Sequence, residues 1–194
     1  MIRRLYDFVL ELSRRPTALP ILTLLSWLES MIFPIPPDVM LIPMCVAEPK
    51  RAMRYAFWCS VGSVLGGICG YALGMFFWDQ LGPWFFEHVP GFTEEKFAWV
   101  HEQFESLGFV IVFAAGFSPI PYKIFTISAG VFEITFATFV LASATSRSAR
   151  FFLVAWLLKR WGIKGQEFID RHLNKLALLF VVLLVGAFAL IKLV

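Results

Sequence analysis

Histidine and cysteine are scarce in this chain, which limits the metal and redox sites that it can hold. The 194 residues include three of each, and no two cysteines form a C-x-x-C pair. The segment 101–105 begins with His-Glu but lacks the second histidine of a zinc-binding H-E-x-x-H helix. We therefore expect no metal site and no cofactor, and we interpret the thiols as small hydrophobic side chains. The residues concerned are Cys45, Cys59, Cys69, His88, His101 and His172.

Sequence patterns typical of enzymes and of nucleic-acid-binding proteins are also missing. There is no Ser/His/Asp set, no G-x-G-x-x-G and no glycine-rich loop that could cradle a phosphate. Charged residues make up only 16% of the chain, and a net charge of +3 does not indicate a nucleic-acid partner. We therefore do not expect an enzyme or a nucleic-acid-binding protein.

Apolar residues, by contrast, are abundant. They make up 59% of the chain, whereas soluble domains contain about 45–50%. The mean hydropathy is +0.74, and several apolar stretches approach the roughly 20 residues that span a bilayer. The first apolar run follows basic residues, as in a signal peptide, but Glu29 and a proline cluster interrupt it and no small-residue cleavage site follows closely. The composition indicates an integral membrane protein whose first segment is retained.

A proline tripeptide occurs twice, 85 residues apart, and each copy interrupts an apolar segment. An acid follows the first copy at the place where a base follows the second. Apolar segments broken at matching places in two halves are typical of transporter binding sites. The copies are Pro34-Ile35-Pro36, followed by Pro37 and Asp38, and Pro119-Ile120-Pro121, followed by Tyr122 and Lys123.

The segments on either side of each proline cluster predict a re-entrant hairpin. Residues 17–33 are apolar except for Glu29, and residues 38–47 are too short to cross a bilayer at about 1.5 Å per residue. Residues 108–117 and 124–132 flank the second cluster in the same way. Non-helical backbone at membrane depth requires protein or a water-filled cavity around it, so both turns are expected beside a cavity.

These segments predict an all-α polytopic membrane protein that forms a single membrane domain over residues 1–194. Its core is an inverted repeat of two re-entrant helical hairpins, each followed by a transmembrane helix, with an N-terminal amphipathic helix and a C-terminal transmembrane helix added. The expected parts are an interfacial helix (1–16), a first hairpin plus span (17–78), an extracytoplasmic segment (79–107), a second hairpin plus span (108–158), a cytoplasmic basic segment (159–175) and a terminal span (176–194). The two spans that follow the hairpins are expected at 55–78 and 135–158. The extracytoplasmic segment is expected to contain helix breakers at Pro83, Pro90 and Gly91 and a short helix capped by Thr93.

A glycine stripe and the distribution of charge complete the expected topology. Four glycines recur at helical spacing in the span 55–78 and predict close helix packing, either within the chain or between protomers of a homo-oligomer. Basic residues gather in segments that this topology places on one side, which the positive-inside rule makes cytoplasmic, together with the N-terminus. The glycines are Gly62, Gly66, Gly70 and Gly74; the basic residues are Arg3, Arg4, Arg14, Arg15, Lys50, Arg51, Arg54, Lys159, Arg160, Lys164, Arg171 and Lys175.

Five ionisable residues are expected at membrane depth: Glu29, Asp38, Lys123, Arg147 and Arg150. Each is costly against lipid, so a partner or a watery cavity is expected. Arg147 and Arg150 share a helix face, and two guanidinium groups suit a phosphate. Glu29 and Asp38 could carry protons or pair with the arginines. Two purely structural alternatives remain open, namely buried ion pairs that hold the hairpins in place and a direct salt bridge between Asp38 and Lys123.

These residues resemble the DedA family, also called VTT or SNARE-associated membrane proteins, and within it the YqaA-like branch. The resemblance covers roughly residues 20–165. It implies paired re-entrant hairpins and movement of lipids across bilayers; bacterial members are similar to undecaprenyl-phosphate and phosphatidylethanolamine translocases that depend on the proton motive force. The motifs are Glu29 before Pro34-Ile35-Pro36-Pro37-Asp38, Gly62-Ser63-Val64-Leu65-Gly66, Gly70-Tyr71-Ala72-Leu73-Gly74, Gly116-Phe117-Ser118-Pro119-Ile120-Pro121-Tyr122-Lys123, Ala129-Gly130, Arg147 and Arg150.

The leading hypothesis is a lipid translocase of the bacterial inner membrane. Arg147, Arg150 and Lys123 would hold the phosphate of a lipid such as undecaprenyl phosphate or a phospholipid, and Glu29 or Asp38 would couple its movement to protons. The alternatives are a proton-coupled exporter of small cationic or amphipathic molecules and a membrane scaffold that transports nothing.

Overall fold

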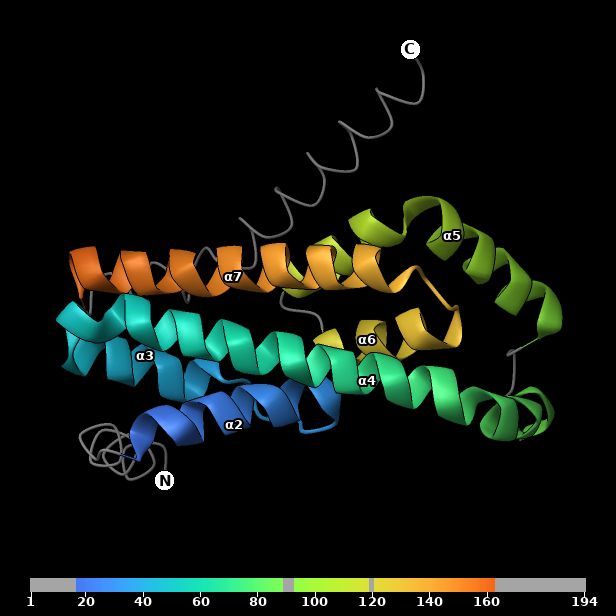
Figure 1. Ribbon diagram of the computed structural model, residues 1–194, viewed down its shortest axis with the longest axis horizontal. Coiled ribbons are helices and arrows are strands. Elements are labelled where there is room, and N and C mark those ends of the chain that lie inside the picture. Colours follow the sequence, from blue (N-terminus) through green and yellow to red (C-terminus); the bar gives the residue numbers. More distant parts are fainter. Residues whose placement is uncertain (1–16, 89–92, 119–120, 163–194) are drawn as a thin grey trace, which may run out of the picture.

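The computed structural model describes residues 17–88, 93–118 and 121–162, and all regular structure in these ranges is helical (Figure 1). The expected interfacial helix (1–16), Pro119 and the expected terminal span (176–194) lie outside the described residues. In chain order the elements are α2 (Ala18–Met31), α3 (Asp38–Ala47), the 3-10 helix η1 (Pro49–Arg51), α4 (Ala52–His88), α5 (Glu94–Phe117), α6 (Tyr122–Val131) and α7 (Phe136–Trp161).

The chain reverses direction at both proline clusters. α2 runs toward the middle of the molecule and α3 returns, while α5 and α6 do the same from the opposite end (Figure 1). The long helices α4 and α7 pack against each other; α2 and α6 pack on α4, and α5 packs on α7. The helices predicted at 38–47 and 135–158, and the two arms predicted at 17–33 and 124–132, are confirmed within a few residues.

The segment between the two halves differs from the prediction. Pro83 does not end a helix, because α4 continues through it to His88. The stacking of Trp78 on Phe97, with ring centroids 4.9 Å apart, holds this end of α4 against α5. Thr93 accepts a hydrogen bond from the Lys96 N–H and caps α5 as predicted, but α5 is one helix of 24 residues rather than a short helix followed by a separate hairpin arm.

The glycine stripe of α4 packs within the chain. A Cβ atom on Gly66 would overlap the backbone of Trp27 in α2, and one on Gly74 would overlap the backbone of Ile127 in α6. Gly130 of α6 approaches the backbone of α4 just as closely. Glycine permits these contacts because it has no side chain to separate two helix backbones. The stripe therefore holds helices of both halves on α4.

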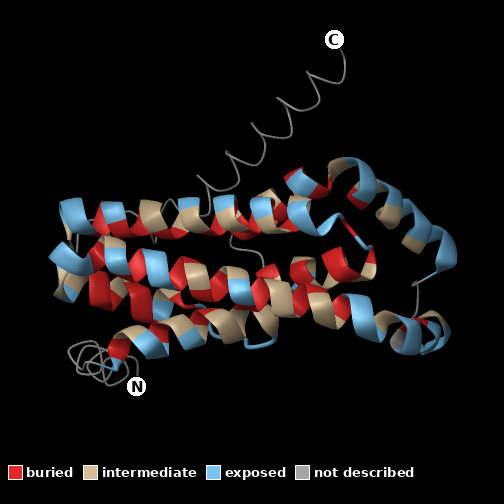
Figure 2. Ribbon diagram, viewed as in Figure 1, coloured by how far each residue is buried: buried red, intermediate tan, exposed pale blue. Residues whose placement is uncertain are grey.

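The exterior of the described part is rich in apolar side chains, and α4 has the length and hydropathy of a membrane span. The helical segment Pro49–Gln80, which joins η1 to most of α4, has a mean hydropathy of 1.5 and is the one such segment among the described residues. Large apolar side chains are exposed on several helices, and buried residues line the interior between α3, α4 and α7 (Figure 2). Exposed apolar surface of this extent marks contact with lipid or another protein. Examples are Leu24, Phe76, Leu141 and Trp156.

Charge is segregated between the two ends of the molecule. α4 begins at the end where α7 finishes, so the basic residues near position 50 lie at the same end as Lys159 and Arg160 (Figure 1). Acidic residues, including Asp79 and Glu94, lie at the opposite end, where α4 finishes and α5 begins. The predicted segregation is therefore present for the basic residues that the structure describes, Lys50, Arg51, Arg54, Lys159 and Arg160, and the other basic residues of the prediction lie outside the described ranges.

Candidate functional site

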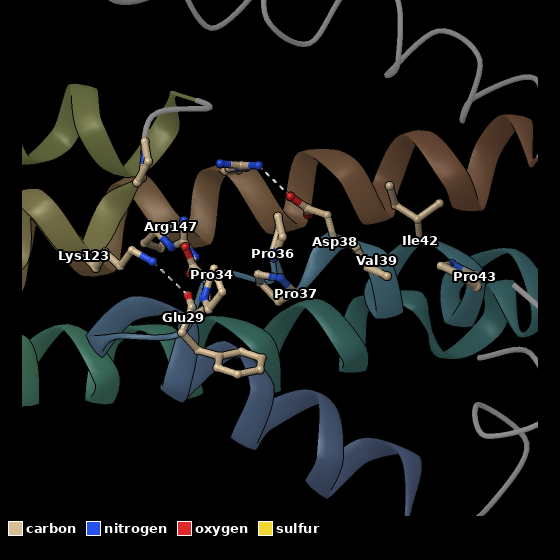
Figure 3. A pocket seen from close by; sticks show the side chains of 13 residues that line it. Glu29, Pro34, Pro36, Pro37, Asp38, Val39, Ile42, Pro43, Lys123 and Arg147 are labelled. Atoms are coloured by element: carbon tan, nitrogen blue, oxygen red, sulfur yellow. Dashed lines mark hydrogen bonds and ion pairs between the residues drawn. The ribbon is translucent and has the colours of Figure 1, made fainter. Parts of the chain in front are cut away.

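A cavity of about 550 Å³ lies where the first proline turn meets α6 and α7, and all five of the predicted membrane-depth charges line it (Figure 3). This volume falls within the roughly 300–1,000 Å³ of typical ligand sites. Four of the five predicted turn prolines also line it: Pro34, Pro36, Pro37 and Pro121. Residues far apart in the sequence are thus brought together at one place.

The prolines position the charges. Proline ends or prevents helix because it lacks a donor and fixes φ, so α2 stops before Pro34 and new helices begin after Pro37 and Pro121. Asp38 and Lys123 therefore stand in the first turns of α3 and α6, at the edge of the cavity. The α-helical N-terminus favours the negative charge of Asp38.

Arg147 is fully engaged by the protein. Its Nη2 donates to Glu29 Oε2 at 2.8 Å and its Nε donates to the Ser63 hydroxyl, while only 2% of the residue is exposed. The guanidinium also lies over the rings of Tyr122 and Phe151, 4.9 and 4.6 Å from their centroids. Such contacts stabilise a buried cation. The geometry makes Arg147 an anchor between α7, α2 and α4.

A chain of hydroxyl groups extends this anchor. The Ser63 and Ser30 hydroxyl oxygens are 2.7 Å apart, and Ser30 donates to Glu29 Oε2 at 3.3 Å. Because Ser63 accepts from Arg147, its own proton is available for Ser30, and the donors therefore run in one direction from Arg147 back to Glu29. Buried networks of this kind stabilise when every member is satisfied.

Arg150 and Asp38 form a more open pair. Arg150 Nη2 donates to Asp38 Oδ2 at 2.6 Å, and Nη1 donates to the Ser118 carbonyl at 2.9 Å. Asp38 Oδ1 and Arg150 Nε are buried and have no hydrogen-bond partner within the described residues. A buried polar atom without a partner is costly. This pair therefore keeps one donor and one acceptor that a ligand or water in the cavity could satisfy once the side chains shift.

Lys123 caps the C-terminal end of α2 rather than pairing with Asp38. Its Nζ donates to the carbonyls of Ile32 and Phe33, at 3.1 and 3.3 Å. The last carbonyls of a helix lack helical partners, and a lysine can satisfy them. The predicted alternative of a salt bridge between Asp38 and Lys123 is therefore wrong, because Asp38 pairs with Arg150.

In both proline turns, the backbone carbonyl at the same position accepts a hydrogen bond from a cationic side chain. Phe33 and Ser118 are 85 residues apart, like the two clusters. The carbonyl of Phe33 accepts from Lys123, and that of Ser118 accepts from Arg150. Each turn thus has its helix-end carbonyl capped by a cation, and one of these cations also holds Asp38.

Several polar residues of the site were not predicted as site residues. Ser30, Ser63 and Thr126 are fully buried, and Thr126 donates to the Ser30 carbonyl at 3.1 Å. Their signal in the sequence is small polar side chains next to the glycine stripe and the prolines, where transmembrane helices pack closely. Among the described residues no group of three or more His, Cys, Asp or Glu could hold a metal ion.

Comparisons with known proteins agree with this architecture. The sequence profile of the VTT domain matches residues 35–160. An uncharacterized protein of Haemophilus influenzae is 42% identical over 193 residues, which are 97% of this chain and 96% of the relative. An uncharacterized protein of Histophilus somni is 41% identical over 174 residues, 86% of this chain and 87% of the relative. No solved structure is significantly similar. The match covers more than half of the chain and most of the cavity lining, and it shows that the chain belongs to the VTT-domain, or DedA, family of membrane proteins.

Proposed function

We propose that this protein is a translocase that moves a phosphate-bearing lipid, such as undecaprenyl phosphate or a phospholipid, across the bacterial inner membrane. The observation that carries the proposal is the unpartnered Nε of Arg150 in a charged cavity surrounded by exposed apolar surface. Arginine binds phosphate oxygens with pairs of parallel N–H donors. The headgroup of an amphipathic anion fits the cavity while its tail stays in the bilayer.

The balance of charge in the cavity supports an anionic ligand. Arg147, Arg150 and Lys123 provide three positive charges against the two negative charges of Glu29 and Asp38, which leaves +1. A phosphate at Arg150 would compete with Asp38 for the same guanidinium. For a phosphate monoester, whose charge is about −1.5 to −2, protonation of the displaced carboxylate would keep the occupied cavity close to neutral and would couple the lipid to a proton.

Membrane placement follows from the segregation of charge. The basic end would face the cytoplasm, with the N-terminus, and the acidic end would face outward. α7 has 26 residues, or about 39 Å at 1.5 Å per residue, which is long enough to cross the roughly 30 Å hydrocarbon core. The reversals at the proline turns would then lie within the membrane as re-entrant hairpins.

The test is lipid movement in proteoliposomes, followed in parallel for a fluorescent polyprenyl phosphate and a fluorescent phospholipid, with and without a proton gradient. The variant Arg150→Met removes the open guanidinium, and Arg54→Met is a matched control on the exposed surface of α4. We expect Arg150→Met to lose movement that Arg54→Met retains. Equal movement in both variants would refute the assignment of the site.

The two alternative functions, a proton-coupled exporter of cations and a scaffold that transports nothing, have less support. Asp38 Oδ1 is unpartnered like Arg150 Nε, but the net charge of +1 on the cavity lining opposes the binding of a cation. A scaffold needs no unpartnered donor, and Arg150 Nε is one among the described residues. If wild type moves neither lipid under any gradient, and the Asp38→Asn variant abolishes efflux of a small organic cation from the same vesicles, the exporter replaces the translocase.

A further inference from the structure

The cavity continues beyond its charged end along one face of α3. Val39, Ile42 and Pro43 line it in a row past Asp38, away from Arg147 and Lys123 (Figure 3). The ring of Phe33 and the ring of Pro36 also contribute to its apolar lining. The cavity therefore has one charged end and one apolar end, which is the polarity of an amphipathic ligand.

The apolar end is open on the outside of the molecule. Val39 is 42% exposed and Phe33 is 39% exposed, while the opposite face of α3 is buried in the core through residues such as Leu41 and Met44. Val39 stands on the exposed face, Ile42 is half-buried at the edge of the core, and Pro43 is buried. Together, Val39, Ile42 and Pro43 form an α3 groove, a continuation of the cavity that reaches the exterior of the described residues at Val39.

Within the described ranges 93–118 and 121–162, the second half shows no equivalent of the α3 groove. Ile124 stands in α6 at the place of Val39, 85 residues later, and it does not line the cavity. Gly130 brings the backbone of α6 directly against α4, whereas Cys45 stands at its place in α3. The cavity of the described residues is therefore continuous with apolar surface along α3 and not along α6.

We propose that the α3 groove holds the part of the hydrocarbon chain that adjoins the phosphate, with the phosphate at Arg150. This rests on the proposed function and adds the path of the tail. Bilayer lipid solvates a hydrocarbon chain as well as protein does, so the groove sets the position of the chain rather than its affinity. Val39 and Ile42 are then positioning residues for the lipid.

The first measurement is photo-crosslinking in nanodiscs with dodecyl phosphate that carries a diazirine on its chain near the phosphate. We expect label on residues 39–43, removed by excess unlabelled dodecyl phosphate and lost in Arg150→Met. Label on Leu24, an exposed residue of α2 away from the cavity, should reflect bulk lipid and resist competition. Label at 39–43 that also resists competition, or its absence there, would overturn the groove.

The second measurement fills the groove. Val39→Trp and Ile42→Trp place a larger ring in the groove, and Leu24→Trp is the matched control. Because Ile42 packs partly against the core, size-exclusion chromatography checks that each variant is folded. We expect both groove variants to lose lipid movement and to retain binding of inorganic phosphate, while Leu24→Trp keeps both. Movement at the wild-type rate in both groove variants would overturn the proposal.

The two proposals can fail separately. Competed label at residues 39–43 without movement of any lipid in wild type would keep the groove and reject translocation. Movement that depends on Arg150, with label elsewhere and active tryptophan variants, would keep translocation and reject the groove.

Discussion

Arg147 and Arg150 lie three residues apart on one face of α7, yet the structure assigns them different tasks, and this difference can be measured. Arg147 is 2% exposed and is held by Glu29, Ser63 and two aromatic rings. Arg150→Met and Arg147→Met remove the same charge from the same helix. We expect Arg147→Met to destabilise the fold more and Arg150→Met to impair phosphate binding more.

The magnitudes follow from what each variant leaves behind. Arg147→Met leaves Glu29 without its ion-pair partner, and the Glu29 side chain is only 13% exposed. Removing one partner of a buried ion pair costs about 3–5 kcal/mol. Arg150→Met removes a side chain that is itself 11% exposed and leaves Asp38, which is 17% exposed, so water can replace a charged hydrogen bond worth about 1.5–3 kcal/mol. The difference of about 2 kcal/mol corresponds to roughly 4–8 °C in Tm for a chain of this size.

The assay is thermal unfolding of the detergent-solubilised protein, followed by tryptophan fluorescence, with phosphate binding measured on the folded protein. A double variant, Glu29→Leu with Arg147→Met, provides the control. Because apolar replacement of a whole buried pair is often neutral, it should recover much of the stability that Arg147→Met loses. Equal Tm values for the two single variants, or a lower Tm for Arg150→Met, would refute the reasoning.

Three further predictions concern the packing and the turns. Gly66→Ala should destabilise by about 1–3 kcal/mol through overpacking on α2, whereas Gly67→Ala, whose Cβ would meet no atom closer than 3.4 Å, should not; equal size-exclusion profiles after heating would contradict this. Ser63→Ala should cost about 1–3 kcal/mol because Arg147 Nε loses its acceptor, and an unchanged Tm would argue against the hydroxyl network. Lys123→Met should speed hydrogen exchange at the hydrogen-bonded amides of Ile32, Phe33 and Val39, since the turn loses its cap; unaltered exchange there would show that the cap does not hold the turn.

Local chemistry made much of the fold predictable. Prolines at 34, 36 and 37 end one helix and begin another whatever surrounds them, and glycines four apart on one face predict a close helix contact. Pro83 was misjudged because stacking between Trp78 and Phe97 stabilises the end of α4, and no local rule contains that contact. Tertiary packing decides where local preference is weak.

The candidate site was predictable as a set of residues but not as a set of pairs. Charges at membrane depth must meet partners or water, so the same five residues were expected together. Which carboxylate meets which cation depends on the rotation of α7 against α2 and α3. That rotation is set by side-chain packing around Phe139 and Phe151, both fully buried, and spacing along the chain does not encode it.

The ion pairs of the cavity also have a consequence for how the protein is made. Glu29 precedes Arg147 by 118 residues, and Asp38 precedes Arg150 by 112. At a synthesis rate of about 5–20 residues per second, each carboxylate leaves the ribosome roughly 5–25 s before its partner. If the proline turns lie within the membrane as proposed, the first half enters it before either acid has met its arginine, and insertion of α7 completes both pairs. A chain truncated before α7 would then carry two carboxylates without their partners, which is costly at membrane depth.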